Sequence, residues 1–141
     1  MNEKIDAYID GRSYTGSGSG FAVILISNKN KWLRSFAYGK YSVNQADLVA
    51  LKFVLLSVNS NIKYDISVFT KNDYIVNIFK KVDNKYSQIP SSNVDMIDEI
   101  KKIIEFKNIT ITKMTSGNLT DMCKNMAIDA IKIGKLIDIR K

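Results

Sequence analysis

Three aspartates stand where metal chemistry could be built. Asp10 ends a predicted strand just before a glycine, while Asp47 and Asp129 fall on predicted helices that otherwise carry many aliphatic residues. An ionised carboxylate in apolar surroundings needs a compensating partner. Mg²⁺ and Mn²⁺ prefer oxygen ligands, and two such ions about 4 Å apart can hold the attacking and leaving oxygens of an in-line phosphodiester displacement. The three carboxylates are therefore candidate ligands for Mg²⁺ or Mn²⁺.

Two of these aspartates also have a simpler interpretation. A carboxylate in the first turn of a helix is favoured by the helix dipole, which could explain Asp47. Asp10 could serve only the turn that follows its strand. Taken alone, each acid is better explained in this way, whereas their occurrence together, in this order of elements, favours the metal site.

The elements that would position these acids follow from hydrophobic periodicity. Alternation predicts strands, and apolar residues three and four apart predict helices. The predicted order is strand, strand, strand, helix, strand, helix, helix, strand, helix, over residues 4–9, 21–26, 31–38, 44–58, 65–70, 73–81, 94–104, 109–114 and about 120–136. We expect a mixed five-stranded sheet with its first three strands antiparallel, flanked by helices, with the helix at 44–58 in a central position.

Length and composition predict one domain spanning residues 1–141 with a preference for polyanions, and the order of elements makes it an α/β domain. Hydrophobic residues make up 45% of the chain, which is enough for a proper core. The 21 Lys and Arg residues exceed the 14 Asp and Glu residues and give a net charge of +7. This excess favours nucleic acid through counterion release, and because nearly all the cations are lysines, binding should depend little on sequence. The aromatic residues between 32 and 41 are expected mostly to fill a sheet face.

Other classes of site and location are disfavoured. Cys123 is the only cysteine and the chain has no histidine, so an internal disulfide and a Cys/His zinc cluster are both excluded. The N-terminus lacks the apolar core of a signal peptide, and no apolar run is long enough to cross a membrane. We therefore expect a cytoplasmic protein that has no membrane partner.

The order of the motifs resembles the ribonuclease H family, in its ribonuclease HI-like form, over nearly the whole chain. Residues 42–51 read Ser-Val-Asn-Gln-Ala-Asp-Leu-Val-Ala-Leu, similar to the family's Thr-Asn-Asn-Gln-Ala-Glu-x-x-Ala-Leu. Residues 113–118, Lys-Met-Thr-Ser-Gly-Asn, and 125–129, Asn-Met-Ala-Ile-Asp, are similar to its Lys-x-His-Ser-Gly and Asn-Glu-x-Ala-Asp segments. The Asp-Gly pair at 10–11 matches its first motif.

The resemblance implies an activity and a set of site residues. The family uses two metal ions to cleave the RNA strand of RNA/DNA hybrids. By resemblance, the metal ligands and catalytic acids are Asp10, Asp47 and Asp129, and the substrate-binding positions are Gly11, Asn44, Gln45, Ser116 and Gly117. The last two of these positions border the family's flexible catalytic loop.

Four departures make this chain a divergent member with an incomplete carboxylate set. Lys71 occupies the place of the acid that usually follows the fourth strand, which removes an oxygen ligand and adds a cation. Thr115 stands for a histidine, and Asp47 is one methylene shorter than the usual glutamate. Finally, Arg12 follows Gly11 where the family has a serine.

Lys71 and the nearby Asp73 each have two interpretations. Asp73 could take the vacant ligand place, or it could be a helix-dipole aspartate beside an N-cap at Asn72, and we favour the second. Lys71 could be a surface lysine, or it could replace a metal ion by pairing with Asp10. We favour the ion pair, because an opposite charge satisfies a carboxylate without metal.

The sequence therefore predicts a degenerate ribonuclease H-like domain. It would bind nucleic acid, either an RNA/DNA hybrid or a duplex, or act as a module of a nucleic-acid-processing assembly, with little or no cleavage. The first alternative is an active Mg²⁺- or Mn²⁺-dependent ribonuclease H. The second is a scaffold for a protein partner that reuses the fold.

Overall fold

The computed structural model describes residues 3–14, 18–28, 30–37, 39, 41–58, 63–82, 85–86, 93–105, 107–114, 117–133 and 137–140. Its elements are β1 (Glu3–Tyr14), β2 (Gly18–Ile26), β3 (Lys31–Ala37), α1 (Val43–Ser57), β4 (Tyr64–Thr70), α2 (Asp73–Ile78), β5 (Lys81–Val82), β6 (Lys85–Tyr86), α3 (Val94–Glu105), β7 (Asn108–Lys113), α4 (Asn118–Ile133) and β8 (Ile137–Arg140). In the part of the chain described, no helix is long and apolar enough to span a membrane.

One mixed sheet carries the fold. Its strand order is β7-β4-β1-β2-β3-β8. The pairs β1–β2 and β2–β3 are antiparallel, whereas β4 lies parallel to both β1 and β7. The predicted five-stranded sheet with three antiparallel leading strands is thus confirmed, with a sixth strand added at one edge and a small separate hairpin formed by β5 and β6.

The sixth strand corrects the predicted end of the last helix. That helix was expected to continue to residue 136, but α4 ends at Ile133, and β8 pairs antiparallel with β3. Residues 137–140 read Ile-Asp-Ile-Arg, an alternation that suits a strand. An uncovered edge of β3 would leave a row of backbone groups unpaired, and β8 satisfies them.

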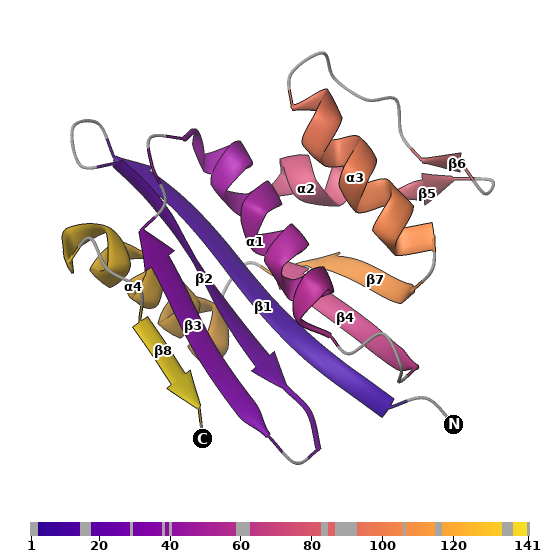
Figure 1. Ribbon diagram of the computed structural model, residues 1–141. Coiled ribbons are helices and arrows are strands. Elements are labelled where there is room, and N and C mark those ends of the chain that lie inside the picture. The colour runs from indigo at the N-terminus through magenta and orange to yellow at the C-terminus, as the bar shows by residue number, and fades with distance from the viewer. Residues whose placement is uncertain are drawn as a thin grey trace.

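The helices form layers on both faces of the sheet (Figure 1). Helix α1 crosses one face over β1 and β2, with α3 packed beside it, while α4 lies on the opposite face. The larger hydrophobic core fills the space beneath α1, and a smaller one lies beneath α4. Helix α1 buries residues on several sides, and so its predicted central position is confirmed.

Residues 21–26 of strand β2 are all apolar, and both faces of this stretch are covered. Phe21, Val23 and Leu25 enter the core beneath α1, and the alternate residues Ala22 and Ile24 enter the core beneath α4. A strand in the middle of a two-sided sheet loses the polar half of its alternation in this way.

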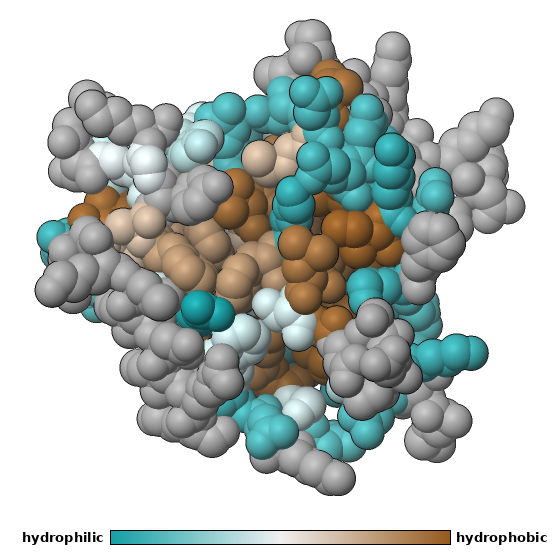
Figure 2. Space-filling model, in the orientation of Figure 1, coloured by the Kyte–Doolittle hydropathy of each residue, from teal (hydrophilic) through white to brown (hydrophobic). Residues whose placement is uncertain are grey.

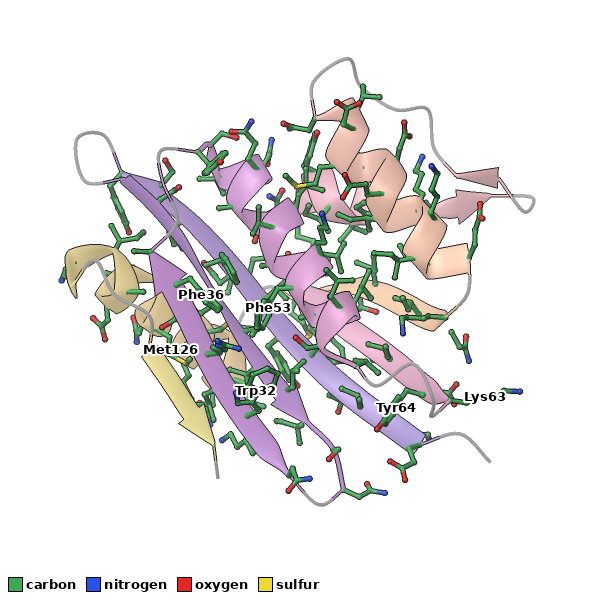
Figure 3. The ribbon with its side chains drawn as sticks, in the orientation of Figure 1. Trp32, Phe36, Phe53, Lys63, Tyr64 and Met126 are labelled. Carbon is green, nitrogen blue, oxygen red and sulfur yellow. The ribbon has the colours of Figure 1, made fainter. Side chains whose placement is uncertain are left out.

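Aromatic residues of β3 fill the sheet face beside α1, as predicted. Trp32 and Phe36 lie on the same side of the strand and contact Phe53 of α1, with ring centroids 5.8 Å and 5.1 Å from that ring (Figure 3). Arg34 stands between them, and its guanidinium carbon lies 4.8 Å from the Phe36 centroid. Figure 2 shows apolar surface at the centre of this side of the molecule and polar surface over α3.

Strand β1 is longer than predicted, and the added residues 10–14 include an acid of the candidate site. The strand continues to Tyr14, because its antiparallel pairing with β2 extends to Gly18. Its parallel pairing with β4 ends at Tyr8 and Phe69. Asp10 therefore lies inside the strand, two residues beyond the last residue of β1 that pairs with β4.

Candidate functional site

Helix α1 is held at a fixed point against β1. Ser42 and Gln45 form a capping box, in which the Ser42 hydroxyl accepts from the Gln45 backbone N–H at 3.2 Å and the Gln45 side chain accepts from the Ser42 N–H at 3.0 Å. The start of the helix rests directly on Gly11, where a Cβ atom would lie 2.5 Å from the Asp47 backbone nitrogen. Only glycine permits this approach.

Asp47 lies buried at this contact, and each of its carboxyl oxygens accepts one hydrogen bond. The Gly11 backbone N–H donates to its Oδ1 at 2.7 Å, and the Asn72 side-chain amide donates to its Oδ2 at 2.8 Å. The same Asn72 amide donates to Asn44 Oδ1 at 2.9 Å. Because Asp47 follows the first turn of α1 and is 3% exposed, it is not a simple partner of the helix dipole. It joins α1, β1 and the end of β4.

Burial raises the pKa of Asp47 to about 7. The hydrogen bond from Asn72 opposes this shift, the charge of Asp10 adds to it, and the bond from Gly11 opposes it. Loss of water outweighs the two hydrogen bonds, because burial penalises only the charged form of a carboxyl group.

Asp10 is paired with an arginine that the sequence analysis did not assign to this role. Arg12 Nε donates to Asp10 Oδ1 at 2.6 Å, and the Arg12 Nη2 donates to Oδ2 at 3.2 Å. Burial raises the pKa of Asp10, which is 6% exposed, while the Arg12 guanidinium and the charges of Lys71 and Lys124 oppose the rise. Alternate residues of a strand share a face, and this spacing brings Arg12 to Asp10.

The ion pair predicted between Lys71 and Asp10 is replaced by two different pairs. Arg12 takes both oxygens of Asp10, and Lys71 Nζ lies 3.2 Å from Oδ1 of Asp121 on α4. A guanidinium matches a carboxylate with two parallel bonds, which the single ammonium of a lysine cannot do.

The first turns of α4 face the site. The Cys123 Sγ lies 3.5 Å from the Tyr8 carbonyl oxygen and 3.2 Å from the Ala22 carbonyl oxygen, so its single S–H can donate to either, and these contacts place the helix over β1 and β2. The next residue, Lys124, places its charge close enough to act on Asp10. Asp129 is exposed more than a turn farther along α4 and does not line the cleft. On α4, the charge of Lys124 thus acts on Asp10, although neither Lys124 nor Asp129 lines the cleft.

Asp73 lies at the rim and has its own cation. Lys113 Nζ is 2.8 Å from Asp73 Oδ1, and Asp73 opens α2 behind the N-cap Asn72, whose side chain accepts from the Tyr74 N–H at 2.9 Å. The predicted N-cap at Asn72 is confirmed, and Asp73 stands in the first turn of α2, where a dipole aspartate was expected.

The residues from these elements line a cleft of about 380 Å³. Its walls are the end of the β1–β4 pairing, the start of α1 and the β4–α2 junction, and the lining residues include Asp10, Gly11, Arg12, Asn44, Asp47, Lys71, Asn72 and Asp73. Gln45 instead bonds Asn93 at 3.0 Å and caps its helix. Gly117 directly precedes α4, and its carbonyl accepts from the Thr120 hydroxyl at 2.9 Å. Ser116 is outside the described residues.

The side chains of this cleft do not provide the free oxygen ligands that a pair of divalent ions needs. Both oxygens of Asp10 already accept from Arg12, and both oxygens of Asp47 accept from backbone and amide N–H groups. Lys71 and Lys124 add positive charge beside them. Among the described residues, no group of three or more Asp, Glu, Cys or His side chains could hold a metal ion. Hard divalent ions need more free oxygen ligands than this.

Neither a protein-family model nor a curated protein sequence matches the chain. Solved structures do match. RNase H1 of the halophilic archaeon Halobacterium salinarum is 15% identical with a TM-score of 0.74, over 92% of this chain and 98% of that one. The N-terminal RNase H domain of a Mycobacterium tuberculosis protein is 13% identical with a TM-score of 0.73, over 94% and 96%. LC11-RNase H1 from compost, bound to an RNA/DNA hybrid, is 16% identical with a TM-score of 0.71, over 92% and 97%.

The chain has the ribonuclease H fold. The resemblance seen in its motifs is thereby confirmed for the architecture. In this ribonuclease H fold, Asp10, Asp47 and Lys71 come from β1, α1 and the end of β4 and meet at one cleft, as the sequence predicted.

We expect Gly11→Ala to destabilise the protein by about 2 kcal/mol or more, because the new methyl group would overlap the backbone of α1. Urea unfolding followed by circular dichroism measures the change. Ser13→Ala, two residues along the same strand, is the matched control and should stay within about 0.5 kcal/mol. Equal stability of the two variants would show that α1 does not rest on Gly11.

We expect the free energy of unfolding to fall as the pH rises from about 5 to 7, by up to about 1.4 kcal/mol per pH unit. Asp47 keeps its proton in the folded state up to about pH 7 and loses it far lower when unfolded, so raising the pH favours unfolding. The chain has no histidine to obscure this slope. Urea unfolding across this range should show the slope in the natural protein and a much flatter profile in Asp47→Asn, whereas equal slopes would contradict the assignment.

Proposed function

We propose that the chain acts as a single ribonuclease H-fold domain that binds the backbone of an RNA/DNA hybrid or a nucleic-acid duplex without metal-dependent cleavage. One observation carries the proposal: Arg12 and Lys71 line the same cleft as the two buried carboxylates, and Arg12 occupies both oxygens of Asp10. Cations at this position attract phosphate and oppose the entry of metal ions.

The charge and the comparisons support this class of ligand. A net charge of +7 favours a polyanion through counterion release. LC11-RNase H1, which shares the fold, was solved in complex with an RNA/DNA hybrid. The cations at the cleft favour binding to the phosphate backbone of the nucleic acid. Contacts that read bases in the major groove rely mainly on bidentate side chains.

The same cleft argues against hydrolysis. Two-metal cleavage needs carboxylate oxygens that can coordinate both ions. The oxygens of Asp10 and Asp47 are engaged, and a metal ion would have to displace Arg12 and Asn72 while approaching Lys71. The proposed role is therefore binding of nucleic acid without hydrolysis of its phosphodiester bonds.

We expect a labelled RNA/DNA hybrid to bind the purified protein in fluorescence anisotropy, with an affinity that falls linearly with salt on logarithmic axes. Gel analysis after incubation in Mg²⁺ or Mn²⁺ should show intact RNA, because the carboxylates are not free to coordinate. Asp10→Asn, prepared in the same way, controls for contaminating nuclease.

Two results would overturn the proposal. Cleavage by the natural protein that disappears in Asp10→Asn would establish an active metal-dependent ribonuclease. The absence of binding even at low salt, with the protein shown to be folded, would leave the scaffold for a protein partner as the better account.

A further inference from the structure

We propose that Arg12, Lys71 and Lys124 form a metal-independent site for one backbone phosphate of the bound nucleic acid. This inference rests on the proposed function, since it names the part of the surface that makes the contact. It assigns phosphate binding to the cations that lie beside the carboxylates of the cleft.

Arg12 is anchored in a way that leaves donors available. A guanidinium carries five N–H donors. The two bonds to Asp10 use one N–H at Nε and one at Nη2, and Arg12 lines the cleft. Asp10 therefore serves as a positioning residue that holds the guanidinium at the cleft, where its other N–H groups can meet a phosphate. Arginine and phosphate commonly form such forked contacts.

Lys71 is held by a partner that a phosphate can replace. Its ammonium pairs with Asp121, whose side chain is 62% exposed, while the side chain of Lys71 is 27% exposed. Exposed ion pairs of this kind contribute little stability, so exchanging Asp121 for a phosphate costs little. Because Lys71 also lines the cleft, the exchange would place the phosphate beside Arg12.

Lys124 supplies the third charge from α4. It lies three residues after Asp121, so the two side chains share a face of the helix, and Asp121 contacts Lys71 at 3.2 Å. Lys124 follows Cys123, whose thiol bonds the Tyr8 carbonyl two residues before Asp10. Its charge acts on Asp10 together with those of Arg12 and Lys71. Charges from β1, the end of β4 and α4 thus act on one carboxylate, that of Asp10.

The remaining acids of the cleft would not repel a phosphate strongly. Asp47 is buried, and both of its oxygens accept hydrogen bonds from Gly11 and Asn72. Asp73 at the rim is paired with Lys113. Each carboxylate therefore has its own donor or cation within the protein.

The test compares single substitutions by fluorescence anisotropy with a labelled RNA/DNA hybrid, in EDTA and separately in Mg²⁺. Lys71→Ala and Lys124→Ala should each weaken binding roughly three- to tenfold and reduce the salt dependence by about one released ion. Lys102→Ala, an exposed lysine of α3 that does not line the cleft, is the matched control and should change the affinity less than about twofold.

Asp121→Asn supplies a test of opposite sign. It frees Lys71 from its pair without removing a cation, so the affinity should rise roughly two- to fivefold, and the exposed position makes a folding defect improbable on physical grounds. Circular dichroism confirms folding for every variant. Affinity in EDTA should be at least as high as that in Mg²⁺, because Mg²⁺ is itself a counterion that the protein must displace from the phosphates.

The outcomes separate this inference from the proposed function. If the natural protein binds but the cleft lysine variants behave like Lys102→Ala, or if EDTA abolishes binding, the metal-independent phosphate site is wrong while nucleic-acid binding stands. If the natural protein does not bind the hybrid under any of these conditions, the proposed function fails first.

Discussion

The contact between Gly11 and Asp47 is the constraint on which the site depends. With no side chain at Gly11, the first turns of α1 reach the backbone of β1, and the Gly11 N–H donates to the Asp47 carboxylate at 2.7 Å. Asn72 then ties the other Asp47 oxygen to the β4–α2 junction. A buried carboxylate is costly unless its oxygens are satisfied, and here the bonds that satisfy it also join three elements. The cleft is the space that these joined elements leave.

The carboxylates in and beside this cleft are compensated by cations of the protein itself. Asp10 has Arg12, Asp73 has Lys113, and Asp121 has Lys71, so each of these carboxylates is matched by a cation of the same chain. A carboxylate cluster that must bind divalent ions leaves that compensation to the metal. The chain thus combines the ribonuclease H fold with a cleft whose carboxylates are paired with cations of the same chain, which is consistent with the general separation of fold from function.

The sequence predicted the architecture well, because its strands and helices carry strong periodic patterns and because the three leading strands, α1 and β4 follow one another as in the family. It also brought Asp10, Asp47 and Lys71 to one place. Arg12 was missed as the partner of Asp10 because the first strand was predicted to end before it, and so the shared face of Asp10 and Arg12 was not considered. Lys124 was missed because the resemblance placed the site residue of the last helix at Asp129, five residues farther along. The contact of Cys123 with the Tyr8 carbonyl, which orients that helix, is a tertiary contact with no local signal in the sequence.

The most direct test of the central claim is a titration of Mn²⁺ into the intact protein, with the free ion followed by electron paramagnetic resonance. Internal compensation of the carboxylates predicts that the protein takes up no stoichiometric Mn²⁺ at neutral pH, and that Asp10→Asn behaves in the same way. Saturable uptake of one or two ions by the natural protein, lost in a folded Asp10→Asn variant, would show that the cleft is a working metal centre and would contradict the account.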